Sequence, residues 1–192
     1  MKKLIIITGI SGSGKSTVAA YLNKNLSSTL ISLDTLKENI FDIIGFKNEL
    51  QKNELKPLIY NIFILLLDEC LKREDECVIV EFPFNASWKE KFESLVLKYG
   101  YDAITLKVKN RGFETIYENL KRRNEGNQRH PAHSLKRYIP HESIKYKSTN
   151  ELDYDELKHD YITDKYTSFS IGKEINLTDF SYKNLIKEID KE

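Results

Sequence analysis

Near its N-terminus the chain reads Leu4-Ile5-Ile6-Ile7-Thr8-Gly9-Ile10-Ser11-Gly12-Ser13-Gly14-Lys15-Ser16-Thr17, an apolar run that leads without a gap into the pattern G-x-x-x-x-G-K-[ST]. Its glycines let a loop wrap a polyphosphate with the backbone N–H groups turned inward, in conformations that a Cβ would obstruct. The helical pattern that follows adds unpaired N-terminal donors and the positive end of a helix dipole. This strand–loop–helix context distinguishes a phosphate-binding loop from a chance glycine-rich turn.

Each residue type in the loop has a role in this interpretation. Lys15 would reach the β- and γ-phosphates, Ser16 would ligate Mg²⁺, and Thr17 would support the α-phosphate side. The sequence therefore predicts ATP and Mg²⁺ as cofactors. The nucleotide-binding residues expected in the loop are Gly9, Ser11, Gly12, Ser13, Gly14, Lys15, Ser16 and Thr17.

Length and composition favour one α/β domain over residues 1–192, because 40% of the residues are hydrophobic and can form a sizeable core. The longest apolar stretch, 58–67, is too short to cross a bilayer, and the N-terminus lacks a cleavable signal pattern. Cys70 and Cys77 lack metal-binding or redox spacing and are typical of core or near-core thiols in a reducing compartment. We therefore expect a cytoplasmic protein without a membrane segment.

Short segments rich in Ile, Val or Leu alternate with helical patterns along the chain. This alternation predicts a mostly parallel sheet with helices on both faces. Residues 125–172 have the least regular pattern. The expected strands are 3–8, 29–33, 77–81, 103–109 and 173–177, and the expected helices are 15–26, 35–44, 48–72, 87–99, 113–124 and 180–190.

Two carboxylates follow predicted strands. Ligands of open parallel sheets lie at the carboxyl ends of the strands, so Asp34 and Glu81 would face the phosphate loop. Asp34 could accept a proton from an attacking hydroxyl, cap the helix that follows, or do both. Glu81 could hold Mg²⁺ directly or through water, bind substrate hydroxyls, or remain a solvated strand-end carboxylate.

An arginine-rich lid is expected at about residues 122–140. On closure over ATP, Arg122 or Arg123 would lie near the adenine, and Arg129 would stabilise charge in the transition state. The alternative is favourable placement of basic residues at a helix C-terminus. His130 and His133 form a weak set of metal ligands because no cysteine lies near them. His130 could instead hydrogen-bond substrate or phosphate, or be an ordinary loop histidine.

Together these features resemble the small P-loop kinases of the AAA-type ATPase-like group, which includes gluconate kinase-like, chloramphenicol phosphotransferase-like, zeta toxin-like and polynucleotide 5′-kinase-like proteins. The resemblance implies five parallel strands in the order 2-3-1-4-5, with Asp34 as the catalytic base. It rests on the glycine loop, Asp34, the strand ending in Glu81, and Arg122-Arg123 followed by Gln128-Arg129-His130-Pro131-Ala132-His133.

Three positions depart from the pattern of that group. Lys37 stands three residues after the aspartate where several of these families have Arg, which disfavours a bidentate grip on a phosphate or carboxylate. Glu81 replaces the more common Asp, which puts direct ligation of Mg²⁺ in doubt, and Ala132 replaces Gly.

The sequence thus predicts a Mg²⁺- and ATP-dependent phosphotransferase that acts on a hydroxyl of a small molecule. The alternatives are a polynucleotide 5′-hydroxyl kinase and a non-catalytic ATP-binding switch. Acceptor selection would lie mainly in residues 35–60 and 82–85, where no motif identifies the acceptor. The predicted catalytic residues are Lys15, Asp34 and Arg129, the substrate-binding residues are Asp34, Lys37, Glu81 and His130, and the metal ligands are Ser16 and Glu81.

The charge pattern generates a first testable prediction. A basic region at 121–147 is followed by an acidic region at 151–164, which would repel an extended phosphate backbone leaving the basic patch. We expect weak oligonucleotide binding that changes little between about 50 and 200 mM salt, a range over which proteins that neutralise many phosphates lose orders of magnitude in affinity. Fluorescence anisotropy of a labelled oligonucleotide measures this affinity at each salt concentration. Tight, strongly salt-dependent binding with 5′-end labelling would favour the polynucleotide kinase.

Overall fold

The computed structural model describes residues 2–109, 112–125, 130–140, 153–163, 166, 168–177 and 184–190. Its strands form one sheet in the order β2-β3-β1-β4-β5, and all neighbouring strands are parallel. The predicted P-loop topology is therefore confirmed. The strands are β1 (Lys3–Thr8), β2 (Thr29–Ser32), β3 (Cys77–Glu81), β4 (Asp102–Val108) and β5 (Lys173–Leu177).

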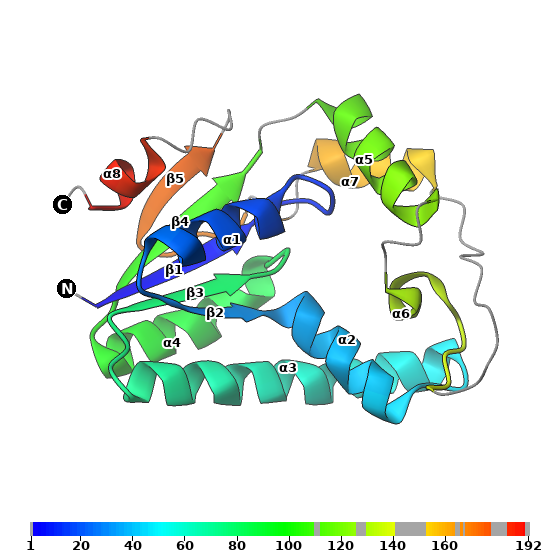
Figure 1. The fold of residues 1–192 in the computed structure, drawn as a ribbon, viewed down its shortest axis with the longest axis horizontal. Coiled ribbons are helices and arrows are strands. Elements are labelled where there is room, and N and C mark those ends of the chain that lie inside the picture. The colour runs from blue at the N-terminus through cyan, green and yellow to red at the C-terminus, as the bar shows by residue number, and fades with distance from the viewer. Residues whose placement is uncertain are drawn as a thin grey trace.

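Helices cover both faces of this sheet (Figure 1). They are α1 (Lys15–Asn25), α2 (Leu33–Ile44), α3 (Glu49–Lys72), α4 (Lys89–Tyr99), α5 (Phe113–Glu125), α6 (Pro131–Ser134), α7 (Tyr154–Thr163) and α8 (Leu185–Asp190), with a 3₁₀ turn at Ala86–Trp88. Alternate side chains of β1 enter two cores: Leu4 and Ile6 pack toward α2, α3 and α4, whereas Ile5 and Ile7 pack toward α1 and α8. Burial on both faces explains why this strand is apolar throughout.

The boundary between β2 and α2 differs from the prediction. The strand ends at Ser32 and the helix begins at Leu33, two residues earlier than expected. The Ser32 Oγ accepts a hydrogen bond from the Thr35 backbone N–H at 3.4 Å and therefore caps the helix. The interpretation of Asp34 as the helix cap is wrong, and its side chain lies in the first turn of α2.

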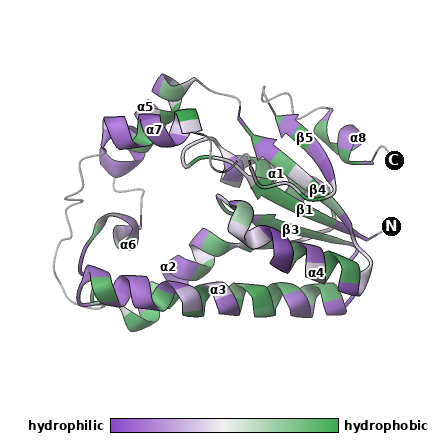
Figure 2. Cartoon of the chain, turned by 180° about the vertical axis from the view of Figure 1, so that it is seen from behind, coloured by the Kyte–Doolittle hydropathy of each residue, from purple (hydrophilic) through white to green (hydrophobic). Residues whose placement is uncertain are grey.

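The described part of residues 125–172 contains two helices, α6 and α7, that the sequence pattern did not predict. No residue of α7 is buried, so its sequence lacks an apolar period. The helix packs on α5 through aromatic rings: the centroids of Tyr154 and Tyr161 lie 4.9 Å and 5.7 Å from that of Phe113. Figure 2 shows that α5 and α7 are largely hydrophilic, in contrast with the central strands.

The predicted core or near-core position of the two thiols is confirmed. Cys70 is buried and Cys77 is partly buried. Burial raises the pKa of the Cys77 thiol to about 11, so it is protonated at neutral pH and packs as a small apolar group. Of the helices that the structure describes, none has both the length and the apolar character required to span a membrane.

An aromatic cluster anchors the segment that follows β3. The ring of Phe84 is fully buried, with its centroid 5.0 Å from Phe92 and 5.4 Å from Trp88. The Thr8 hydroxyl donates a hydrogen bond to the Phe84 carbonyl at 3.0 Å. These contacts fix residues 82–83 against the end of β1, where the glycine loop begins.

Phe84→Ala should therefore destabilise the fold. Removing this fully buried ring leaves a cavity and should lower the free energy of unfolding by about 3–5 kcal/mol. The control is Leu97→Ala, since Leu97 is 86% exposed and its truncation should change stability by about 0.5 kcal/mol or less. Urea denaturation measures both variants, and equal stabilities would contradict the assigned role of the cluster.

Candidate active site

A cavity of about 1020 Å³ lies at the carboxyl ends of β1, β2 and β3. Its lining includes loop residues 11–17 and residues of α2, α3, α5 and α6. Small-molecule sites commonly occupy about 300–1,000 Å³, so this cavity has room for a nucleotide and an acceptor. Of the predicted site residues, those that line it are Ser11, Gly12, Ser13, Gly14, Lys15, Ser16, Thr17, Asp34, Lys37, Glu81, Arg122 and Arg123.

Close contacts with neighbouring atoms require glycine at two positions of the loop. Gly9 and Gly12 have φ values of 140° and 80°, in the region that disfavours residues with a Cβ. A Cβ on Gly9 would lie 2.6 Å from the Val108 carbonyl oxygen, and one on Gly12 would lie 2.9 Å from Leu120 Cγ. Glycine at these positions thus permits the turn of the loop and the direct packing of α5 against it.

The loop presents polar groups that fit a polyphosphate. The Ser13 Oγ is buried without a hydrogen-bond partner among the described residues, an arrangement that is costly unless a ligand supplies one. The Lys15 ammonium is buried and donates to the Ile10 carbonyl at 3.0 Å. Burial lowers the pKa of Lys15, while the nearby carboxylates of Glu81 and Asp34 raise it. A phosphate oxygen would provide a partner for the hydroxyl and a counter-charge for the ammonium.

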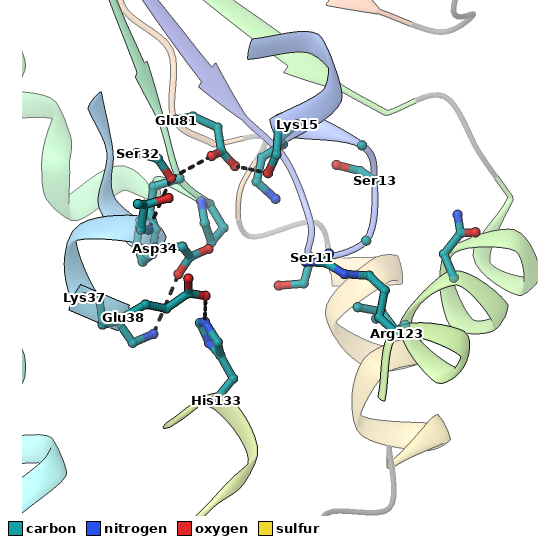
Figure 3. A pocket seen from close by; sticks show the side chains of 18 of the residues that line it. Ser11, Ser13, Lys15, Ser32, Asp34, Lys37, Glu38, Glu81, Arg123 and His133 are labelled. Carbon is teal, nitrogen blue, oxygen red and sulfur yellow. Dashed lines mark hydrogen bonds and ion pairs between the residues drawn. The ribbon is translucent and has the colours of Figure 1, made fainter. Parts of the chain in front are cut away.

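Glu81 links the loop to the neighbouring strand (Figure 3). It is 3% exposed and accepts hydrogen bonds from the Ser16 hydroxyl at 3.2 Å and the Ser32 hydroxyl at 3.0 Å. Burial raises the pKa of Glu81, and the Lys15 charge and the Ser32 hydrogen bond lower it. The interpretation of Glu81 as a solvated strand-end carboxylate is wrong, because the side chain is buried.

The pair formed by Ser16 and Glu81 fits a hard cation such as Mg²⁺, which prefers oxygen ligands. No group of three or more His, Cys, Asp or Glu residues that could hold a metal occurs among the described residues. An ion at this pair would therefore need further ligands from phosphates and water, which is the usual mode of Mg²⁺ binding.

Asp34 and Lys37 lie together on the first turns of α2. The Lys37 Nζ is 3.7 Å from the Asp34 Oδ1, and the two side chains are 15% and 38% exposed respectively. Figure 3 shows both on the same side of the cavity as Glu38 and His133. The predicted substrate-binding residues of this helix thus share one region of the site.

His130, which precedes α6, and His133, which lies within it, have different surroundings. The His130 Nε2 lies 2.9 Å from the Asp42 Oδ1, and its Nδ1 accepts the Ala132 N–H and caps α6, so this ring is outside the cavity lining. The His133 Nε2 lies 2.7 Å from the Glu38 Oε1 and lines the cavity. Its hydrogen bond lowers the pKa of Glu38. The substrate contact predicted for His130 stays a prediction.

The start of the predicted lid faces the glycine loop. The Arg123 side chain points toward Ser11 in Figure 3, and its charge acts to lower the pKa of Lys15. The Arg122 Nη2 donates to the Asn119 Oδ1 at 3.2 Å. Arg129 lies outside the described residues, so its predicted role stays a prediction.

Further along the predicted lid, a backbone bridge holds the chain against the segment between α2 and α3. The N–H of Phe46 donates to the Tyr138 carbonyl at 2.6 Å, and the N–H of Tyr138 donates to the Phe46 carbonyl at 2.8 Å. Together with the histidine contacts, this bridge connects residues 130–140 to α2 and to the segment that follows it.

Sequence reasoning missed several polar residues of the cavity. Lys52 and Lys56 come from α3, one turn apart, and fall within the segment expected to select the acceptor. Their spacing of four residues signalled a shared helix face but not its direction. The cavity residues that were not predicted also include Ser32, Glu38, Asn119 and His133.

Comparisons with known proteins show solved structures of similar fold. No curated protein matches the chain. It resembles the crystal structure of a candidate kinase from Chloroflexus aurantiacus at 18% identity and a TM-score of 0.76, covering 98% of this chain and 96% of that chain. It also resembles the tunicamycin resistance protein of Deinococcus radiodurans at 13% identity and a TM-score of 0.58, covering 98% of this chain and 94% of that chain. A third similar structure is shikimate kinase from Bacteroides thetaiotaomicron, at 16% identity and a TM-score of 0.55, with 98% of each chain covered.

The family comparison covers the phosphate loop, both strand-end carboxylates and α6. A family model described as an AAA domain matches residues 4–140, which is more than half of the chain. The chain therefore belongs to this AAA domain family, and its predicted resemblance to the small P-loop kinases is confirmed.

Proposed function

We propose that the protein is a Mg²⁺- and ATP-dependent phosphotransferase that phosphorylates a hydroxyl of a small molecule. One observation carries the proposal: the Asp34 carboxylate and the Lys15 ammonium both line one cavity at the carboxyl ends of the parallel strands. A general base and a phosphate-binding cation must lie within one site if an acceptor hydroxyl is to attack a phosphoryl group.

The loop side of the cavity would bind the nucleotide. When bound, MgATP supplies the phosphoryl group and a divalent charge that neutralises it. Lys15 and the Ser13 hydroxyl would hold phosphate oxygens, and Ser16 with Glu81 would hold the cation. Arg123, which points toward the loop, would stabilise negative charge that develops during transfer.

The α2 side would hold the acceptor. Asp34 would accept the proton of the attacking hydroxyl, and the partly buried Phe82 and Pro83 would exclude water from that hydroxyl. Most of the rate would come from positioning and electrostatics, because phosphoryl transfer requires little covalent chemistry from the protein. The name of one structural neighbour, shikimate kinase, supports a small-molecule acceptor.

The experiment that tests this proposal is Asp34→Asn. The amide keeps the shape of the side chain but cannot act as a base, so phosphotransfer should fall by about 10²–10⁴-fold while the affinity for MgATP stays unchanged. Labelled ATP with a screen of hydroxylated compounds identifies a working acceptor, and calorimetry measures nucleotide binding.

The contrasting variant is Lys15→Ala, which loses a charge-assisted phosphate contact and should bind MgATP about tenfold or more weakly. Retained phosphotransfer in Asp34→Asn, with a lower free energy of unfolding, would assign Asp34 a structural role and overturn its role as the base.

The metal site generates a separate prediction. Glu81→Gln keeps the shape of the side chain and one acceptor oxygen for the Ser16 or Ser32 hydroxyl, and its amide N–H can donate to the other hydroxyl, but it removes the charge that attracts Mg²⁺. The gain in ATP affinity produced by Mg²⁺ should fall by about 10–100-fold, whereas ATP affinity in EDTA should not change. Calorimetry with and without Mg²⁺ measures this difference.

The matched control is Glu93→Gln, because Glu93 forms an exposed ion pair on α4 with Lys89 and does not line the cavity. An equal loss of ATP affinity with and without Mg²⁺ in Glu81→Gln would mean that Glu81 shapes the loop and does not bind the ion.

A further inference from the structure

We propose that the acceptor is an anion and that Lys56, together with Lys37 and Lys52, binds its negative charge on the α2–α3 side of the cavity. This inference rests on the proposed function, which it deepens by naming the class of acceptor. Lys56 is the central residue, because it lines the cavity and has no hydrogen bond or ion pair with any residue that the structure describes.

The face of α3 that carries these lysines is directed into the site. Lys52, Lys56 and Tyr60 follow one another at intervals of one turn, so they lie on the same side of the helix. The Tyr60 ring is 6.2 Å from that of Phe82, which lines the cavity, and both lysines line it as well. Lys56 is only partly exposed, so its charge is partly removed from bulk water.

The carboxylates on this side of the cavity already have partners. The Asp34 carboxylate lies 3.7 Å from the Lys37 ammonium, and the Glu38 carboxylate lies 2.7 Å from the His133 ring. The Lys52 ammonium donates a hydrogen bond to the carbonyl of Leu135 at 3.1 Å.

Lys56 thus lines this side of the cavity without a hydrogen bond or ion pair to any described residue, and the carboxylates of Asp34 and Glu38 beside it are each paired with another group. A partly buried charge without a counter-charge is unfavourable, so an anionic ligand would be stabilised here and a neutral one would not.

The cations on the other side of the cavity are not available to the acceptor. Lys15, Arg122 and Arg123 surround the phosphate loop, where the proposed function places the nucleotide. The charge of the acceptor must therefore lie near α3, while its reacting hydroxyl lies at Asp34. The acceptor class is a hydroxylated compound with an anionic group some distance from the hydroxyl that receives the phosphoryl group.

The chemistry of lysine leaves two sources for that negative charge. An ammonium is a point charge with rotatable donors, and it lacks the planar fork with which arginine selects a bidentate partner. A carboxylate and a phosphate monoester would both bind, so the proposal covers hydroxy acids and sugar phosphates.

The test is a panel of matched acceptors, assayed by ADP release in the presence of MgATP. Each pair differs only in charge: an aldonate and its alditol, a cyclic hydroxy acid and its methyl amide, and a sugar phosphate and its parent sugar. The expected result is turnover of an anionic member with little or none of its neutral partner. The carboxylate and phosphate arms separate the two sources. Equal or faster turnover of the neutral partners would overturn the proposal.

Lys56→Gln provides the residue-level test on the anion that reacts best. The variant should lower kcat/KM for that anion by about 10–100-fold through the loss of a charged hydrogen bond, and the KM for ATP should not change. The matched control is Lys72→Gln, because Lys72 lies at the end of the same helix in an exposed pair with Glu69. An unchanged kcat/KM in Lys56→Gln would contradict the proposal.

A second readout does not depend on turnover. Mass spectrometry follows the acetylation of Lys56 and Lys72 by an amine reagent, in the presence of Mg²⁺ and a non-hydrolysable ATP analogue. Anionic members of the panel should slow the modification of Lys56 and leave that of Lys72 unchanged.

If the anions protect Lys56 but no compound supports ADP release, the phosphotransferase proposal fails and the anion site stands. If no anion protects Lys56, the anion site is wrong, whatever the kinase activity.

Discussion

The buried carboxylate of Glu81 is the constraint on which the rest of the site depends. A charged group that is 3% exposed needs polar partners, and the hydroxyls of Ser16 and Ser32 donate to its two oxygens. One side chain at the end of β3 thus holds the start of α1 and the capped start of α2. The strand order places β3 between β1 and β2, so the three parallel strands end side by side and the three residues can meet.

The packing of α5 against the phosphate loop requires glycine at position 12. Because Gly12 has no Cβ, its backbone adopts a positive φ and Leu120 packs directly against it. Arg123 follows Leu120 by about one turn of the helix and points toward the loop (Figure 3). The glycine that shapes the loop therefore also allows α5 to bring this guanidinium close to it, and in the proposed function this would place the charge of Arg123 near the bound nucleotide.

Contacts between α2 and residues 130–140 organise the α2 side of the cavity. The rings of His130 and His133 lie against carboxylates of α2, and the backbone bridge between Phe46 and Tyr138 holds the end of this segment. The contact with His133 pairs the carboxylate of Glu38, which lines the same cavity as Lys52 and Lys56. In the proposed function, the segment that was predicted as a lid would therefore also influence the charge that an acceptor meets.

The sequence by itself determined the phosphate loop, the alternation of strands and helices, and the position of Asp34 and Glu81 near strand ends, because all three follow from local spacing. Only the tertiary structure decided that His133 lines the cavity while His130 caps a helix, and that Lys56 lines the cavity. A helical period identifies which residues share a face, but the packing of neighbouring elements decides what that face meets. The helix α7 was not predicted because it has no buried residue, and its sequence therefore lacks an apolar period.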